Sequence, residues 1–233
     1  METFNLDRET ARLIIFQRIQ FLTTFGQKIR KLFGRYIFTN FYSKYLINSK
    51  VIGKRYFDEM KSEYENLSKY ISFNDKKILS IGGGMCGLEL IINFYSKNNF
   101  FSIIEKNYVS KKIKYGWDEN NDEAYNNIDL LNKFLQKNGM KKNQFQIHDF
   151  DKYDYPLNNF DYVISLYSLD YHYDFNLYLA YFKKIVKKET VFIFDTIRPD
   201  YFNKLFESVK IIGLENKKIH SSKRILCKNF LRN

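Results

Sequence analysis

The chain has 233 residues, of which 45% are hydrophobic and 27% charged, and its formal net charge is +12. These values predict one folded domain, or one domain with an appended segment, and exclude a disordered or collagen-like chain. The excess of basic residues favours anionic partners such as nucleic acid, lipid head groups or phosphorylated substrates. The two cysteines, Cys86 and Cys227, form no C-x-x-C or Cys/His cluster, so neither a disulfide framework nor a zinc site is indicated. Because the sequence shows no export signal and no run of about 18 apolar residues, we expect a reduced, cytoplasmic protein.

Residues 1–74 are expected to form an N-terminal helical region. Apolar residues recur at helical spacing over 11–38, which predicts one long amphipathic helix with a basic opposite face, and a second helix is expected over 55–70. This helix is expected to pack on the main domain or on a second subunit, with its basic face in solvent. Alternatively, the basic face makes a peripheral contact with the inner face of an anionic membrane. It also leaves RNA open as a partner.

From residue 75 onward, short apolar runs alternate with helical stretches, a pattern typical of βα units and a parallel sheet. The expected strands lie at 78–81, 101–105, 145–148, 162–166 and 191–195. The expected helices lie at 87–95, 122–137, 175–187 and 200–206. Two last strands, 209–214 and 223–228, are expected to pair as a hairpin. We predict an α/β fold over 75–233: a Rossmann-like seven-stranded sheet, with five parallel strands and an antiparallel C-terminal hairpin, flanked by helices.

A glycine-rich turn follows the first expected strand. In "ILSIGGGMCG", Gly82, Gly84 and Gly87 form a G-x-G-x-x-G motif, which lets the backbone and a helix N-terminus approach a cofactor. Glu105, at the end of the second expected strand, is placed to accept hydrogen bonds from both hydroxyls of a ribose. Nicotinamide, flavin and S-adenosylmethionine enzymes share these two features, so the turn and the acid leave the cofactor open.

Later landmarks bear on this choice. Asp149 follows the third expected strand, where a carboxylate can accept a hydrogen bond from an adenine amino group. The segments "ILSIGGGMCG", "SIIEKN", "IHDFDKYDYPLNNFDYVIS" and "VFIFDTIRPD", followed by the hairpin, resemble in their order the motifs of class I S-adenosylmethionine-dependent methyltransferases. The resemblance covers 75–230. Within that family the chain looks most similar to bacterial methyltransferases associated with surface-polysaccharide or glycan biosynthesis, across "YGWDENNDEAYNNIDLLNKFLQKNGM" and "SLYSLDYHYDFNLYLAYFKKIVKKETVFIFDTIR".

The resemblance implies that S-adenosylmethionine is the cofactor and S-adenosylhomocysteine its product. The residues that it places at the cofactor are Ser80, Gly82, Gly83, Gly84, Gly87, Glu105, Lys106, Asp149 and Phe150. The glycines would approach the methionine and adenosine moieties, Glu105 the ribose, Asp149 the adenine and Phe150 the face of the ring. Ser80 departs from the family, which usually has an acid two residues before the first glycine. A hydroxyl can accept a hydrogen bond there, but it lacks the charge that helps to fix the methionine ammonium group.

The methyl acceptor is expected after the fourth strand, at the carboxyl edge where open α/β sheets bind ligands. There "SLYSLDYHYDF" offers His172 as a general base, because an imidazole can be neutral near pH 7, and Asp170 either to orient His172 or to bind the substrate. Substrate contacts are expected from Tyr115, Trp117, Tyr167, Tyr171 and Arg198. Simpler roles stay open for these side chains: packing of His172 and the loop aromatics, and a surface salt bridge for Arg198. No acidic cluster indicates a metal.

We therefore predict an S-adenosylmethionine-dependent methyltransferase that methylates oxygen on a small-molecule or glycan-type acceptor. No N/D-P-P-Y/F-like motif follows the fourth strand, which argues against methylation of a base amino group. Methylation of other RNA atoms remains an alternative. So do a noncatalytic methyltransferase-like protein that binds RNA or a membrane, and an NAD(P)-dependent oxidoreductase.

Overall fold

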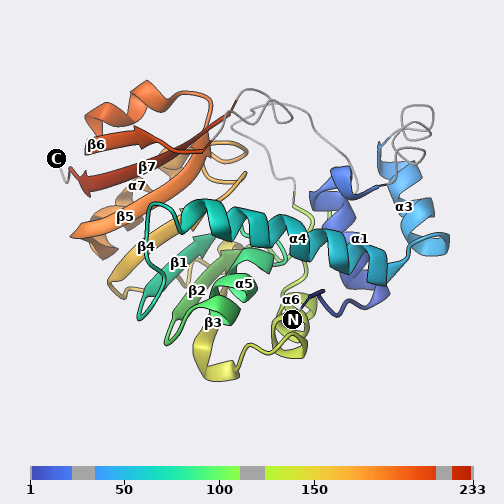
Figure 1. Ribbon diagram of the computed structural model, residues 1–233. Coiled ribbons are helices and arrows are strands. Elements are labelled where there is room, and N and C mark those ends of the chain that lie inside the picture. The colour runs from blue at the N-terminus through green and yellow to red at the C-terminus, as the bar shows by residue number, and fades with distance from the viewer. Residues whose placement is uncertain (1, 23–34, 111–123, 214–221, 232–233) are drawn as a thin grey trace.

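A seven-stranded sheet with the strand order β3-β2-β1-β4-β5-β7-β6 forms the centre of the computed structural model, which describes residues 2–22, 35–110, 124–213 and 222–231 (Figure 1). The strands are β1 Lys77–Ile81, β2 Phe100–Glu105, β3 Phe145–Asp149, β4 Phe160–Ser165, β5 Val186–Thr196, β6 Phe206–Ile211 and β7 Lys223–Phe230. Strands β1 to β5 pair in parallel, and β7 runs antiparallel to both β5 and β6. The predicted parallel sheet and its terminal hairpin are confirmed.

Helices cover both faces of this sheet. The α-helices are α1 Arg8–Gln17, α3 Arg35–Tyr45, α4 Ser49–Leu67, α5 Gly87–Tyr95, α6 Ile128–Lys137 and α7 Leu179–Ile185. Short 3-10 helices are η1 Ile19–Phe21, η2 Lys142–Gln144, η3 Phe150–Lys152, η4 Phe175–Tyr178 and η5 Pro199–Lys204. Figure 1 shows α4 and α5 lying across one face, with α1 behind the N-terminal end of α4.

Alternation along the strands divides the core into two hydrophobic clusters. Ile78 of β1 is buried in a cluster with residues of α1, α4, α5 and α6, whereas the next residue, Leu79, is buried in a cluster with residues of α7 and η5. Phe4 joins the first cluster, where its ring centroid lies 5.3 Å from that of Tyr56 and 5.5 Å from that of Phe134. The N-terminal helices therefore share a hydrophobic core with the sheet domain.

The prediction of a single long helix over 11–38 is wrong. Helix α1 ends at Gln17, because Arg18 leaves the helical conformation with φ −135° and ψ 79°. Its guanidinium lies 2.9 Å from a Glu59 carboxylate oxygen on α4. The next described helix, α3, begins only at Arg35. Three of the basic residues expected on this face, Lys28, Arg30 and Lys31, lie outside the described residues.

Further differences concern the boundaries of elements. The helix expected over 55–70 is α4, which begins at Ser49, and the strand expected over 209–214 is β6, which spans Phe206–Ile211. The helix expected over 175–187 ends at Ile185, and β5 begins at Val186, five residues earlier than expected. Asn127 caps α6, so the described residues 124–127 are not helical. The helix expected near 200–206 is the 3-10 helix η5. Within the described ranges, none of the helices combines the length and the apolar character needed to cross a bilayer.

Candidate functional site

The glycine-rich turn connects β1 to α5 at the carboxyl edge of the sheet. Gly82 and Gly84 have φ values of +63° and +64°, which side-chain-bearing residues rarely adopt. A Cβ on Gly82 would lie 2.0 Å from Ser168 Oγ, so this turn passes against the segment that follows β4. Cys86 also has a positive φ of 52° and precedes the first residue of α5. The spacing of the glycines in the sequence did not predict that Cys86 adopts the left-handed backbone conformation.

Close packing explains Gly87. A Cβ there would lie 2.5 Å from Cζ of Tyr56, and the Gly87 N–H donates a hydrogen bond of 2.9 Å to the Tyr56 hydroxyl oxygen. The N-terminus of α5 is thus fixed by a phenol from α4. Helix α4 therefore positions one part of the predicted cofactor site.

Glu105 ends β2 next to the turn. Its carboxylate accepts hydrogen bonds from the backbone N–H of Gly84 and from Asn126. Burial raises the pKa of Glu105 to about 8, although these hydrogen bonds act in the opposite direction. The carboxyl group is therefore at the predicted place, and it contacts the glycine turn directly.

Three further predicted cofactor residues, Lys106, Asp149 and Phe150, lie near Glu105. Asp149, the last residue of β3, is the register partner of Glu105 across the two parallel strands. Phe150 follows it, and Lys106 Nζ lies 5.3 Å from the centroid of the Phe150 ring. The structure thus brings Glu105, Lys106, Asp149 and Phe150 together at the ends of β2 and β3, next to the glycine turn.

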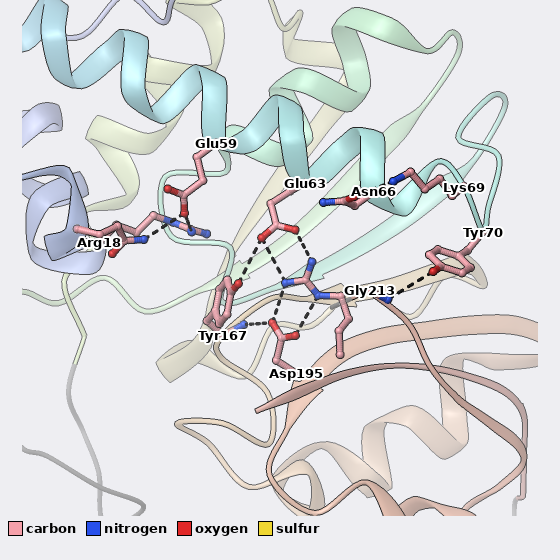
Figure 2. A network of polar contacts seen from close by, with 11 residues as sticks. Arg18, Glu59, Glu63, Asn66, Lys69, Tyr70, Tyr167, Asp195 and Gly213 are labelled. Atoms are coloured by element: carbon pink, nitrogen blue, oxygen red, sulfur yellow. Dashed lines mark hydrogen bonds and ion pairs between the residues drawn. The ribbon is translucent and has the colours of Figure 1, made fainter. Parts of the chain in front are cut away.

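Tyr167 lies in a polar network after β4 (Figure 2). Its hydroxyl donates a 3.3 Å hydrogen bond to Glu63 on α4, and its backbone N–H donates one of 3.1 Å to Asp195 on β5. The guanidinium carbons of Arg18 and Arg224 lie 5.4 and 5.5 Å from the centroid of its ring. Burial raises the pKa of Tyr167 to about 12, so its phenol acts as a hydrogen-bond donor near neutral pH rather than as a base.

Arg224 connects the two carboxylates of this network. It pairs with Glu63, and its Nε lies 2.9 Å from Oδ1 of Asp195, its register partner across β5 and β7. Burial lowers the pKa of Arg224, but Asp195 and Glu63 outweigh this effect and raise it. The residues predicted for the site did not include Glu63, Asp195 or Arg224. The sequence offers one indication of these three residues, because each is a charged residue within or beside an apolar segment.

Asp170 and Arg198 form a second polar cluster. The Asp170 carboxylate is fully buried, accepts a hydrogen bond from Thr196 and forms an ion pair with Arg198. Arg198 also pairs with Asp174 at 3.1 Å. The hydrogen bond to Asp170 raises the pKa of Arg198. Arg198 thus forms a salt bridge, but with a buried carboxylate rather than at the surface as expected. The partners of Asp170 described here differ from the predicted one, His172.

His172 itself is exposed, and its ring meets Tyr171 edge-on, with the centroids 4.8 Å apart. Tyr115 and Trp117 lie outside the described residues. The segments on either side of them meet in a β-bridge between Val109 and Tyr125. No group of three or more potential metal ligands occurs among the residues that the structure describes.

Helix α1 contacts the glycine turn as well. Gln17 accepts a 3.3 Å hydrogen bond from the backbone N–H of Met85, and its amide donates one of 2.7 Å to the carbonyl oxygen of Tyr125. A Cβ on Gly84 would lie 2.5 Å from the Gln17 side-chain oxygen. The last residue of α1 is therefore part of this site, and sequence spacing gave no indication of it.

Comparison with known proteins identifies the fold. Neither a protein-family model nor a curated protein matches the chain. Among solved structures, the chain is similar to the mitomycin 7-O-methyltransferase at 10% identity and a TM-score of 0.50, over 77% of this chain and 56% of that one. It is equally similar to a protein from Nostoc punctiforme PCC 73102 described as an O-methyltransferase, at 10% identity and a TM-score of 0.50, over 77% of this chain and 58% of that one.

Coclaurine N-methyltransferase gives a weaker likeness, at 12% identity and a TM-score of 0.43, over 65% of this chain and 38% of that one. The chain thus spans little more than half of the length of the first two structures, and less of the third. The first two likenesses, together with the strand order, show that the chain has a Rossmann-like methyltransferase fold.

Proposed function

We propose that the chain is an S-adenosylmethionine-dependent methyltransferase. One observation carries the proposal. The glycine turn after β1, the Glu105 carboxyl group at the end of β2 and Asp149 at the end of β3 lie side by side at one edge of the sheet. In a Rossmann-like fold this is the edge at which ligands bind. The likeness of the fold to O-methyltransferases supports the same activity.

The residues present fit this cofactor. Gly82 and Gly84 form a turn without side chains, and Glu105 and Asp149 supply neighbouring carboxyl groups for ribose hydroxyls and an adenine amino group. Phe150 supplies an aromatic face. When bound, the cofactor supplies an electrophilic methyl group. The protein then has to align the acceptor, exclude water and, for a hydroxyl acceptor, remove its proton.

We assign the acceptor side to the segment after β4. Tyr167 donates a hydrogen bond there, and its high pKa excludes it as the base near neutral pH. His172 remains our proposed base, since it is exposed at the same edge of the sheet. The expected reaction is O-methylation of a small molecule or sugar. A role in bacterial surface-polysaccharide synthesis, in the cytoplasm, is the more specific form of this proposal.

Binding of S-adenosylhomocysteine tests the cofactor assignment. We expect the purified native protein to gain thermal stability with this ligand, because a ligand that binds only the folded state stabilises it. Glu105→Ala and Gly84→Val should remove this gain, since one deletes the ribose acceptor and the other places a side chain against Gln17. The exposed Glu65→Gln is the matched control, and it should retain the full gain.

Nicotinamide cofactors test the rival activity. A gain in stability with NAD(H) or NADP(H), and none with S-adenosylhomocysteine, would contradict the proposal and favour an oxidoreductase. The site cannot be assigned by the glycine turn alone, because both classes of enzyme use such a turn. The two titrations therefore belong in one experiment, on the same preparation of protein.

A further inference from the structure

Ser80 stands at the end of β1, where the sequence lacks the acid that the resemblance leads one to expect. It is 1% exposed, and its hydroxyl donates a hydrogen bond to the carboxylate of Glu89, in the first turn of α5. The Glu89 side chain is itself only 3% exposed. A carboxyl group is thus present at this point of the fold after all, but it comes from the helix rather than from the strand.

Gly83 lies directly against this pair. A Cβ there would be 2.9 Å from Ser80 Oγ and 3.0 Å from Oε1 of Glu89, tighter than ordinary contacts. Unlike Gly82 and Gly84, Gly83 does not have a positive φ, so it is close packing that requires a glycine here. The middle residue of the three-glycine run is therefore fitted to the Ser80–Glu89 pair beneath it.

The second carboxylate oxygen of Glu89 has an unusual environment. It is buried and makes no hydrogen bond within the described ranges, although the Cys86 thiol and the backbone N–H of Glu89 lie close enough to the carboxyl group to lower its pKa. Buried polar atoms are nearly always hydrogen-bonded in native proteins, so this oxygen calls for an explanation. The nearby cation Arg18 forms its ion pair with Glu59. Burial raises the pKa of Glu89, although the hydrogen bond from Ser80 and the charge of Arg18 act in the opposite direction.

We propose that Glu89 is a positioning residue of the cofactor site, supplying from α5 the carboxyl group that Ser80 does not supply from β1. It lies beneath the glycine turn, where its ionised form favours a ligand whose amino-acid end carries an ammonium group. This inference rests on the proposed function. It explains why the chain dispenses with an acid at the end of β1: two carboxylates in contact would repel each other, and Ser80 instead donates to the one at Glu89.

The test compares two ligands by isothermal titration calorimetry. S-adenosylhomocysteine carries the ammonium group, whereas 5′-methylthioadenosine keeps the adenosine and sulfur but lacks the amino-acid end. We expect the nearly isosteric Glu89→Gln to weaken S-adenosylhomocysteine binding by about tenfold or more, as for a lost charge-assisted interaction. Binding of 5′-methylthioadenosine should change less than about threefold, because it makes no contact that depends on this charge.

A double variant provides the rescue. Ser80→Asp combined with Glu89→Gln places a carboxylate at the end of β1 and a carboxamide on α5. We expect the affinity of this double variant for S-adenosylhomocysteine to lie within about threefold of that of the native protein. Ser80→Asp alone should bind more weakly, because it places two carboxylates in contact. The double variant also carries the test if Glu89→Gln alone does not fold.

Three outcomes overturn the inference. Native-like affinity of Glu89→Gln for S-adenosylhomocysteine would show that its charge is not used. Equal losses for both ligands, or no rescue in the double variant, would show that Glu89 only maintains the shape of the turn. If the native protein binds neither ligand, the proposed function itself fails, which distinguishes that failure from the failure of the assignment to Glu89.

Discussion

Arg224 offers the sharpest test of the polar network, because its removal leaves two buried carboxylates without their cation. The side chains of Arg224 and Glu63 are each 13% exposed, and that of Asp195 is 3% exposed. Breaking a buried ion pair by removal of one partner typically costs about 3–5 kcal/mol. We therefore expect Arg224→Met, which keeps much of the apolar stem, to lower the free energy of unfolding by about that amount.

Urea denaturation at neutral pH measures this change. The control is Lys54→Met on α4, which removes an exposed pair with Asp58 and should cost less than about 0.5 kcal/mol. Adding Glu63→Gln and Asp195→Asn to Arg224→Met should recover part of the loss, since the carboxamides carry no charge to leave unpaired. A loss below about 1 kcal/mol for Arg224→Met would refute the reasoning, because it would show that the carboxylates are solvated or otherwise compensated.

Three further predictions concern the site. The Glu105 carboxyl group holds its proton between its ordinary pKa of 4.5 and about 8 in the folded state but releases it in the unfolded state, so the free energy of unfolding should fall as pH rises through this range. Glu105→Gln should flatten that dependence in urea titrations, and an unchanged slope would count against the raised pKa. Gly82→Ala should lower the free energy of unfolding by about 2 kcal/mol or more, because Gly82 has a positive φ and lies close to Ser168. Gly139→Ala is the control: Gly139 has φ +97° but open space around its Cβ, so this variant should show only the smaller cost of backbone strain. Equal losses in the two variants would contradict the close approach of Gly82 to Ser168. Tyr167→Phe should lower the free energy of unfolding by about 1 kcal/mol through loss of its hydrogen bond to α4, and a stabilised variant would contradict that bond.

Much of the sheet follows from local sequence. The apolar runs that form β1 to β4 are each bounded by polar residues, so their positions were predicted to within about two residues. The first part of β5 was missed because Val186–Thr190 contains two lysines and a glutamate, which continue a helical pattern on paper. Val186 pairs with Phe160, and the Thr190 hydroxyl donates a hydrogen bond to the Phe160 carbonyl oxygen, so contacts with β4 rather than local preference decide the conformation of this segment.

The long helix predicted over 11–38 shows what local sequence could not predict. Its apolar spacing continues past Gln17, so periodicity alone gives no reason to end it there. The interruption comes from contacts distant in sequence: Arg18 pairs with Glu59, and Arg55 donates to the backbone carbonyl of Phe21. Such partners, about 40 residues apart, are invisible to a helical pattern.

The residues that we propose for the cofactor were easier to predict than those that we propose for the acceptor. The positions of glycines in a turn and of acids at strand ends follow from the course of the backbone. Gly82, Gly84 and Glu105 could therefore be assigned to the carboxyl edge of the sheet from their order along the chain. The segment after β4, which we propose for the acceptor, is held by side-chain pairs from distant segments, such as Glu63 with Arg224. Glu89 was missed for a related reason, since an acid in the first turn of a helix is ordinary until its burial against Ser80 is known.

Calorimetric titration of the native protein with S-adenosylhomocysteine tests the central claim most directly. At a pH above about 8, where Glu105 is ionised, we predict saturable binding at one site per chain, and we predict that Glu105→Ala abolishes it. Absence of binding by folded native protein, or binding that Glu105→Ala leaves unchanged, would contradict the assignment of this edge of the sheet as an S-adenosylmethionine site.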